Sequence, residues 1–566
     1  MGAHQSPGRS GRTAHTLVVL AALLLSLGLG IPAASSAAPP TAVARAPAPA
    51  PIPNTECLAC HATGLMGAPK VNAQVLAHSV HASLACVSCH TSIKQIPHPV
   101  PVAPVVCARC HETEGHQLAT GSHAPWMAPQ GTTGRRRATP TCITCHGTHD
   151  IQPVTSRTFR RNIVATCASC HARAYRSYML TPHGQAAALG MKRAPTCITC
   201  HNPHSALPPS NPLARMAPGN RLATCQGCHS GASANLIGFN PHPRPDDPRS
   251  SQLLTAVHYF MVVLLVGVFG FFGLHTLLWL QRSLIGRLRG ELPALSHFRG
   301  PYIQRFTVVD RLTHLTVILS FMLLSLTGLA LMHPETSWAR AITGFFGGPH
   351  TMSIVHIVNG AITFGYFFFH ICYIGYRVAV KKERFAILGE DSLVPNWNDI
   401  RDIGRNFRWF LYLGPQPRMG RWTYWEKFDY WAVFWGVAII GVSGLMLAAP
   451  VFFARFVPGI WLNVALVVHS EEALLATGFI FIFHFFHNHL RPEKFPIDVS
   501  ILTGRVPLDR FKEERPRQYQ QLLEEGRLER SIVPPPSPFL TMISVIFGLA
   551  VVVTGVTLIL LVIFAG

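Results

Sequence analysis

The chain has 566 residues, of which 49% are hydrophobic and only 13% are charged, and its formal net charge at pH 7 is +21. This apolar, charge-poor composition argues against a single water-soluble globular domain and favours a membrane protein that carries a soluble part. The positive charge does not indicate a nucleic-acid partner, because many basic residues lie in loops beside apolar runs, where membrane proteins collect them.

The first 37 residues have the pattern of a secretory signal peptide. Arg9 and Arg12 precede the apolar run TLVVLAALLLSLGLGI, which ends in the small residues AASSA. Because this run is short and ends in a cleavage-type region, we expect residues 1–37 to be removed after export; an uncleaved anchor is the alternative. Residues 38–53 are rich in Pro and Ala and are expected to form an extended linker. Whether residues 1–37 are removed or retained as an anchor, the segment that follows them is expected to lie outside the cytoplasm.

Residues 54–248 contain seven C-x-x-C-H motifs, which use all but one of the fifteen cysteines. In such a motif the two thiols form thioethers with a haem, and the adjacent imidazole becomes the proximal iron ligand. Disulfides and zinc ribbons do not need a histidine after every second cysteine, so we interpret this segment as a loop-rich, haem-packed heptahaem cytochrome c domain. The expected thioether residues are Cys57, Cys60, Cys86, Cys89, Cys107, Cys110, Cys142, Cys145, Cys167, Cys170, Cys197, Cys200, Cys225 and Cys228. The expected proximal ligands are His61, His90, His111, His146, His171, His201 and His229.

A sequence repeat of about 55 residues supports this interpretation, because ATPTCITCHGTHD at Ala138 recurs as APTCITCHNPH at Ala194. A six-coordinate haem needs a second axial ligand, and nine further histidines are available for seven irons. We expect the distal ligands to be His78, His81, His116, His123, His149, His183 and His204, which leaves out His98 and His242. No motif obviously reserves an open iron for a substrate, so an electron wire is favoured over a reductase.

Six apolar segments, each long enough to span a bilayer, follow the motif-rich region. They lie at about 254–280, 312–333, 352–377, 429–450, 461–486 and 538–565. If the first segment enters from outside, most basic loop residues fall on the cytoplasmic side, as the positive-inside rule requires. We therefore predict a mostly α protein of the bacterial cytoplasmic (inner) membrane, with residues 54–248 in the periplasm.

Histidines lie at two depths of these segments, and an imidazole pair from facing helices can hold a haem without covalent attachment. Depth pairs His356 with His469 near the outer face. It pairs His484 with either His314 or His370 near the inner face. His258 and His275, in the first segment, leave a third haem b open. The region is thus predicted to comprise a linking helix (254–280), a di-haem cytochrome b four-helix core (312–486), a cytoplasmic segment (487–537) and a last helix (538–565).

The run RLTHL around His314, together with His356 and the His469–His484 pair, resembles the haem b subunits of membrane formate dehydrogenases and Ni-Fe hydrogenases. The resemblance implies that His314 and His484 hold the inner haem and that His356 and His469 hold the outer one. The sequences HSEEA and HFFHNHLRPEKFPID resemble more closely a branch in which such a domain follows a multihaem cytochrome c. That branch includes inner-membrane quinol dehydrogenases and tends to have a histidine like His370, so the inner pairing stays open.

The predicted function is membrane electron transfer with quinol dehydrogenase activity. Menaquinol or ubiquinol would be oxidised at two haems b, and electrons would pass through seven haems c to a periplasmic cytochrome c or another redox acceptor. Glu472, one helical turn from His469, is a candidate acceptor for a quinol proton, and a purely structural hydrogen bond is the equal alternative. Two other functions stay open: an anchor for a separate catalytic subunit, and a reductase of a small nitrogen or sulfur compound.

Overall fold

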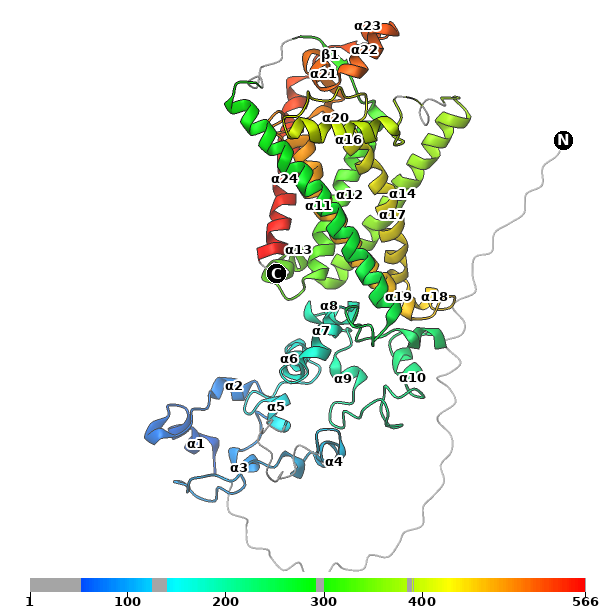
Figure 1. Ribbon diagram of the computed structural model, residues 1–566. Helices are drawn as coiled ribbons and strands as arrows, with labels where there is room; N and C mark the ends of the chain where they lie inside the picture. The colour runs from blue at the N-terminus through cyan, green and yellow to red at the C-terminus, as the bar shows by residue number, and fades with distance from the viewer. Residues whose placement is uncertain (1–51, 125–139, 292–299, 384–388, 390, 565–566) are drawn as a thin grey trace, which may run out of the picture. The chain divides into compact units, whose positions relative to one another are not determined.

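The computed structural model describes residues 52–124, 140–291, 300–383, 389 and 391–564. The expected signal peptide, residues 1–37, and all but the last two residues of the expected linker lie outside the described residues. Apart from three short strands, the regular structure of the described part is helical, which confirms the predicted mostly α fold class (Figure 1).

The N-terminal part consists of short helices joined by long loops. Its helices are α1 (Asn54–His61), η1 (Leu65–Gly67), α2 (Ala73–Ala77), α3 (Cys86–Cys89), η2 (Cys107–Arg109), α4 (Glu112–Thr120), α5 (Cys142–His146), α6 (Arg157–Ala168), α7 (Ala172–Met179), α8 (Pro182–Ala188), α9 (Cys197–Cys200), α10 (Arg221–Gln226) and η4 (Ala234–Gly238). Each C-x-x-C-H motif lies on one of these helices or runs off its end. Residues three apart share a helix face, so this local structure turns both thiols of a motif to one side.

The N-terminal part buries little apolar surface of its own. Its main apolar cluster joins α6, α7 and α8 through Phe159, Ile163, Val164, Tyr178 and Ala187. Elsewhere large apolar side chains are open to solvent, and Met66 is 92% exposed. A segment of this size needs a larger core to be stable by itself, so its fold requires additional buried groups.

The C-terminal part contains six helices that, among the described residues, are long and apolar enough to cross a membrane. They are α11 (Gln252–Leu288), α12 (Val308–Met332), α14 (Pro349–Ala379), α17 (Tyr424–Ala448), α19 with its π-helical continuation (Ile460–Leu490) and α24 (Pro538–Phe564). All six correspond to the predicted apolar segments. Two begin at capping boxes, Thr307 with Asp310 and Thr423 with Glu426, in which side chains satisfy the free amides of the first turn.

Helix α19 ends at Gly478, and the chain continues in two π-helical stretches, η5 (Phe479–His484) and η6 (Phe486–Leu490). A π-helical turn closes an i to i+5 hydrogen bond and so takes up an extra residue compared with an α-helical turn. The spacing of 15 residues between His469 and His484 overshoots one face of a regular α-helix by about 60°. The wider turns offset this overshoot and return His484 to the side of the helix that carries His469.

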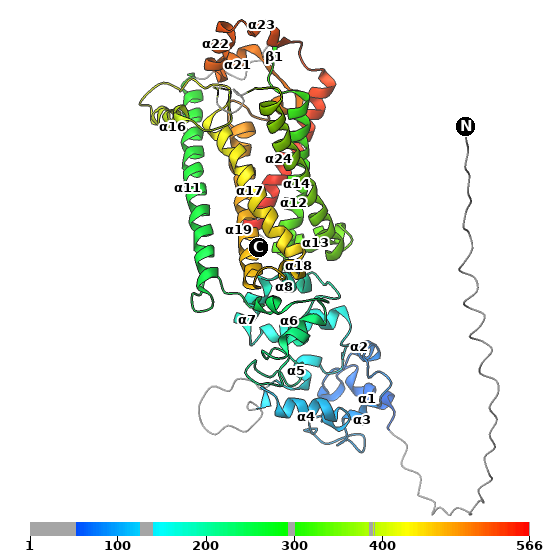
Figure 2. The same ribbon diagram turned by 90° about the vertical axis from the view of Figure 1, so that its right-hand side faces the viewer.

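The bundle is built around two helix pairs. Helices α17 and α19 pack together, as do α12 and α14, while α11 packs along α19 and α24 contacts α12 and η5. Figure 2 shows α11 at one edge of this arrangement. The shorter helices are α13 (Ser337–Phe345), α16 (Trp397–Phe410), α18 (Pro450–Phe453), α20 (Ser500–Thr503), α21 (Leu508–Glu514), α22 (Pro516–Glu524) and α23 (Leu528–Ser531).

A small sheet lies in the segments that connect the membrane helices at the end away from the N-terminal part. Its strands are β1 (Tyr302–Gln304), β2 (Arg505–Pro507) and β3 (Ile532–Val533), in the order β2-β1-β3. Both pairings are antiparallel, and Tyr302 lies opposite Pro507 on one side and Val533 on the other. Ile303, Val506 and Phe511 form the apolar cluster beneath the sheet.

The N-terminal part is joined to one end of the bundle by hydrogen bonds and a close backbone approach. The side chain of Asn463 accepts a hydrogen bond from the Asn240 amide (2.8 Å) and donates one to the Asn240 carbonyl (2.9 Å). A Cβ on Gly459 would lie 2.2 Å from the Phe239 nitrogen, so only glycine permits this approach. These contacts hold the segment around Phe239 directly against the start of α19.

Candidate haem-binding sites

Every motif histidine of the N-terminal part faces a second histidine. The ring centroids of these pairs lie 6.0–6.3 Å apart, too far for a direct hydrogen bond. A metal held by one nitrogen of each ring at about 2 Å separates the ring centres by about 6 Å. The pairs are His61–His98, His90–His149, His111–His81, His146–His204, His171–His123, His201–His242 and His229–His183.

This arrangement differs from the expected one at two positions. His98 and His242 face His61 and His201, whereas His78 and His116 were expected from the sequence to be distal ligands. His78 is exposed and its ring is hydrogen-bonded to the Gln74 carbonyl (2.7 Å), and His116 is also exposed. No local sequence pattern identifies His98 and His242 as the facing histidines. His242 lies about forty residues beyond the motif that it faces, and His98 lies in a proline-rich loop.

The seven pairs follow one another through space in the order of the chain. Cysteines of each two consecutive motifs lie near one another: Cys57 and Cys86, Cys89 and Cys107, Cys107 and Cys142, Cys145 and Cys167, Cys167 and Cys197, and Cys200 and Cys225. The motifs therefore form an unbroken row that ends at the membrane part.

Both histidines of the last pair in this row are partly buried. Burial, with a smaller contribution from His229, lowers the pKa of His183 to about 4. A neutral imidazole is the form that binds a metal, so this environment suits a ligand at neutral pH. Phe239, which packs against the His183 ring, belongs to the segment that contacts the start of α19. The row thus ends beside the bundle.

Two further histidine pairs lie inside the bundle at different depths. His356 on α14 faces His469 on α19 with ring centroids 6.3 Å apart. His314 on α12 faces His484 on η5 at 6.4 Å. Both separations match those of the N-terminal pairs, and both pairings agree with those that the resemblance implies.

Hydrogen bonds at the Nδ1 atom orient three of these four rings. The Nδ1 atoms of His356 and His469 are hydrogen-bonded to Thr327 Oγ1 (2.8 Å) and to the Ile440 carbonyl (2.9 Å). His484 donates from Nδ1 to the Asp429 carboxylate at 2.8 Å. Because Nδ1 is occupied in each case, Nε2 remains to bind a metal, as is usual for histidine ligands.

The four bundle histidines line one cavity of about 2840 Å³. This volume is several times that of a pocket for a drug-sized ligand. The cavity also reaches Cys228 and His229 of the last N-terminal pair, so it continues from one part of the chain into the other. Only large groups can fill this cavity. Haem is large enough, and the facing histidines provide the axial ligands that its iron needs.

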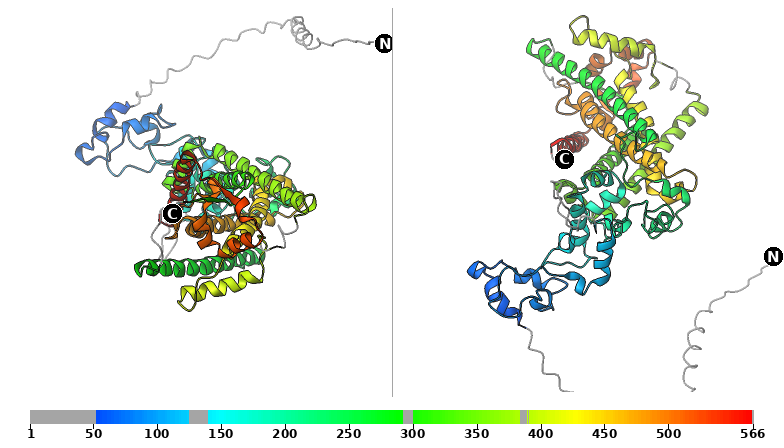
Figure 3. Two further views of the ribbon diagram at one scale, coloured as in Figure 1. Left: turned by 90° about the horizontal axis from the view of Figure 1, so that it is seen from above. Right: turned by 60° about the horizontal axis from the view of Figure 1, so that its bottom comes forward.

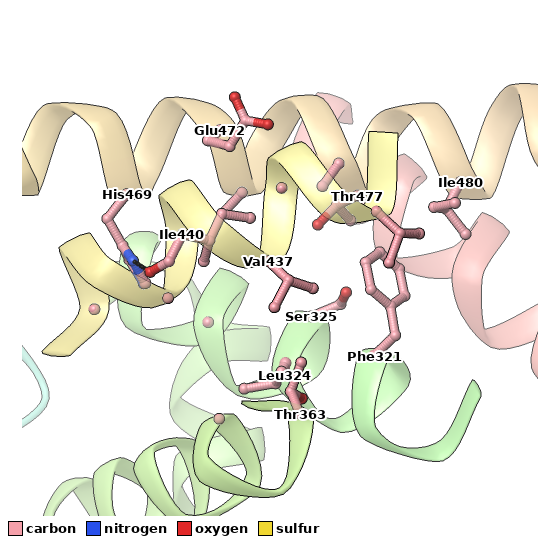
Figure 4. Close-up of a pocket in the computed structure, with 18 of the residues that line it drawn as sticks. Phe321, Leu324, Ser325, Thr363, Val437, Ile440, His469, Glu472, Thr477 and Ile480 are labelled. Atoms are coloured by element: carbon pink, nitrogen blue, oxygen red, sulfur yellow. Dashed lines mark hydrogen bonds between the residues drawn. The ribbon is translucent and has the colours of Figure 1, made fainter. Parts of the chain in front are cut away.

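Glycines leave space beside two of the rings. A Cβ on Gly328 would lie 3.2 Å from His356 Cε1, and one on Gly444 would lie 3.0 Å from His469 Cε1. Figure 4 shows His469 pointing from α19 toward Ile440, with Val437, Ser325 and Leu324 farther along the cavity wall. The lining is mainly apolar with histidines as the convergent polar groups, which fits a porphyrin held by axial ligands.

The other histidines of the membrane helices form different hydrogen bonds. His370 is hydrogen-bonded to the Tyr430 hydroxyl (2.9 Å) and does not face His484. His258 is bonded to the Glu471 carboxylate (2.5 Å). His275 and His487 are buried and hydrogen-bonded directly to each other (3.0 Å), which leaves no room for an iron between them.

Glu472 is buried at 3% exposure and lines the cavity one turn from His469. Its carboxylate is hydrogen-bonded to Trp435, and its Oε2 has no partner among the described residues. Figure 4 shows that this carboxylate points away from the His469 ring. The site therefore contains one buried, half-satisfied carboxylate at the level of the outer pair.

Comparison with known proteins gives an independent description of both parts. Residues 35–91 match the family described as cytochrome c554 and c-prime. The cytochrome b556(Fdn) subunit of the nitrate-inducible formate dehydrogenase of Escherichia coli K12 is 24% identical over 229 residues, 40% of this chain and 93% of that subunit. The cytochrome b556(fdo) subunit of formate dehydrogenase from the same strain is 25% identical over 177 residues, 31% of this chain and 74% of that subunit.

These similarities and the six membrane-length helices confirm the resemblance drawn from the sequence. The chain is a membrane electron-transfer protein that combines a multihaem cytochrome c part with a cytochrome b part. The similarity at the amino end covers the first two C-x-x-C-H motifs, and the remaining motifs lie beyond it.

Proposed function

We propose that the protein oxidises a lipid quinol in its membrane part and delivers the electrons to a redox partner outside the cytoplasm. The observation that carries this proposal is the continuous cavity, which joins two histidine pairs at different depths of the bundle to the last pair of the N-terminal row. Haem, when bound, supplies one-electron redox chemistry. A quinol gives two electrons and two protons, so a site that oxidises it must also receive protons.

The proposal includes nine haems, and the histidine pairs support a ligand set for each of them. Seven haems c would be held by the C-x-x-C-H cysteines, with His61, His90, His111, His146, His171, His201 and His229 opposite His98, His149, His81, His204, His123, His242 and His183. Two haems b would be held by His314 with His484 and by His356 with His469. The membrane orientation that we propose places the N-terminal part in the periplasm.

Glu472 is the proposed proton acceptor on the side of the outer pair. A buried carboxylate with one free oxygen can accept a proton, and the cost of keeping it charged in an apolar environment favours this step. The neighbouring Glu471 is bonded to His258 near the outer end of α11 and is partly exposed. A proton would therefore be accepted first by the buried Glu472 carboxylate and then by the more solvent-accessible Glu471 carboxylate.

The proposal is tested by mixing the oxidised holoprotein with a short-chain menaquinol in a stopped-flow spectrometer under anaerobic conditions. We expect absorbance changes of both haem b and haem c. Glu472→Gln is expected to slow this reduction about 100-fold, the usual contribution of a positioned base. Glu291→Gln is the matched control, because it removes a carboxylate that pairs with Arg282 and lies outside the cavity. An unchanged spectrum of both haem types after quinol addition would refute quinol oxidation.

A second candidate function is that of a membrane anchor for a separate catalytic subunit. The support for it is that both E. coli relatives are named as subunits of formate dehydrogenases. Purification from native membranes under mild conditions distinguishes the two functions. A stoichiometric dehydrogenase subunit that reduces the haems when its own substrate is added would favour the anchor.

A small-molecule reductase is less favoured. Such an enzyme needs an iron with an open position, whereas all seven motif histidines of the N-terminal part face another histidine. A high-spin haem c signal in the oxidised holoprotein would support the reductase, and a wholly low-spin spectrum would support the electron wire.

A further inference from the structure

Helix α16 (Trp397–Phe410) presents three different faces to its surroundings. The face that packs on the bundle is formed by Asp402, Asn406, Trp409 and Phe410, all of which are buried. The exposed side is divided into two adjacent stripes at 100° per residue. One stripe is apolar, with Trp397 and Ile400 exposed by 77% and 58% and Leu411 and Leu413 exposed just beyond the helix. The other is basic and consists of Arg401, Arg405 and Arg408.

This helix lies at the end of the membrane helices that is remote from the N-terminal part. It contacts α11 and α17, and Figure 1 shows that it runs across the axes of the spanning helices. The view from above in Figure 3 places it beside α11 at the outer edge of the bundle. Arg282 of α11 packs over the Tyr412 ring at 4.4 Å, which fixes the end of α16 to α11.

An amphipathic helix with exposed Trp and aliphatic side chains next to a basic stripe is typical of a segment that lies in a membrane interface. The last turns of α11 extend the same apolar surface, since Leu284 and Leu288 are 48% and 87% exposed. At this level of a membrane bundle, the exposed apolar side chains of α16 and α11 would be surrounded by lipid acyl chains. The arginines of the neighbouring stripe then stand at the depth of the lipid headgroups.

A separate pocket of about 820 Å³ opens beside the basic stripe. It lies between α16, the loop that follows it and α22, and four arginines line it: Arg405, Arg408, Arg418 and Arg517. Asp402 pairs with two of them, Arg405 (3.1 Å) and Arg517 (2.9 Å). One carboxylate, Glu524, also lines the pocket and accepts a hydrogen bond from Gln520. Within the part of the chain that the structure describes, Arg408 and Arg418 are in no ion pair, and four arginines outnumber Asp402 and Glu524, so the pocket keeps excess positive charge.

We propose that this pocket binds the phosphate headgroup of an anionic phospholipid in the leaflet that contains α16. A phosphodiester anion matches the paired donors of arginine side chains, and the lipid's acyl chains would lie along the apolar stripe beside it. The site is independent of the haem sites and of the proposed quinol oxidation. It stands on the helix position, the pocket and the unpaired arginines together.

The test uses purified, delipidated holoprotein and native mass spectrometry with dioleoylphosphatidylglycerol, dioleoylphosphatidylcholine or inorganic phosphate as the probe. The wild-type protein is expected to prefer phosphatidylglycerol to phosphatidylcholine by at least tenfold. Each basic residue near a membrane surface adds about fivefold to the affinity for an anionic lipid. The double variant R408Q/R418Q is therefore expected to lose about 25-fold in affinity for phosphatidylglycerol, with its haem spectrum unchanged.

The matched control is K382Q/R530Q, which also removes two exposed positive charges but changes no residue of the pocket. It is expected to retain the wild-type affinity for phosphatidylglycerol within about twofold. An equal loss in both double variants would show that only overall charge matters, and it would overturn the site. Displacement of the lipid by an equal concentration of inorganic phosphate would overturn the assignment to a lipid.

Discussion

The N-terminal part and the membrane part hold histidine pairs of almost the same spacing in very different surroundings. Ring centroids are 6.0–6.3 Å apart in the first part and 6.3 and 6.4 Å apart in the second. In the N-terminal part the paired rings come from loops and short helices around one small apolar cluster. In the bundle they come from long helices that pack against each other over many turns.

The difference shows what each part requires from its cofactor. The bundle helices bury their own aromatic and aliphatic clusters, so the cavity between them is bounded by protein that is already packed. A non-covalent haem is sufficient there, because the walls exist before it binds. The N-terminal part lacks such walls, and in the proposed arrangement covalent attachment at each motif would tie the chain to groups that serve as its core.

The most severe way to test this comparison is to prevent haem attachment to the cysteines. In cells that lack the attachment machinery, we expect the N-terminal part to stay unfolded and the membrane part to insert, because only the first depends on haem for its core. Limited proteolysis of isolated membranes should then degrade the region 54–248 and leave a fragment that begins near Gln252. Equal protease resistance of the two parts would contradict the proposed difference.

Removal of one bundle ligand is expected to have a smaller and more local effect. His469→Ala and His484→Ala should each lower the haem b content from two to one per chain and leave haem c unchanged, since the packed helices tolerate the loss. The pyridine haemochrome assay measures both contents. His370→Ala is the matched control, because His370 is bonded to Tyr430 and faces no second histidine. Loss of haem b in that variant would contradict the assignment of the inner ligands.

A subtler change is expected from the distal ligands of the N-terminal part. His98→Ala should convert one of seven haems c from low spin to high spin without releasing it, because its thioethers remain. Electron paramagnetic resonance of the oxidised protein detects this change. His78→Ala, which removes an exposed histidine from the same region, should leave the spectrum unchanged. A changed spectrum of His78→Ala with an unchanged spectrum of His98→Ala would instead identify His78 as the distal ligand, as expected from the sequence.

These two histidines show where the sequence is informative about the sites. The C-x-x-C-H motifs indicate one ligand of each proposed haem, because attachment requires fixed local spacing. The second ligand is set by how loops fold over neighbouring motifs, and His242 comes from a segment that also contacts α7 through the Ala174 carbonyl. Such long-range packing has no periodic signature, so local rules favoured His78 and His116.

The membrane part was more predictable because hydrophobic length and depth limit the possible pairings. The six helices, the outer pair and both alternatives for the inner pair follow from these constraints. The choice between His314 and His370 depends on helix rotation, and the π-helical turns at Phe479–Leu490 alter that rotation. The second hydrogen bonds to the ligands, such as the one from His484 to Asp429, could not be predicted from spacing.

That hydrogen bond leads to the smallest effect in this series. A carboxylate that accepts the Nδ1 proton of an axial histidine makes the imidazole a stronger donor and favours the oxidised iron. Asp429→Asn should therefore raise the midpoint potential of one haem b by about 40 mV, equivalent to about 1 kcal/mol. Tyr430→Phe is the matched control, because the neighbouring Tyr430 is bonded to His370 instead. Spectroelectrochemical titration separates the two variants, and a similar shift in both would mean that the bond to His484 does not set the potential of the inner site.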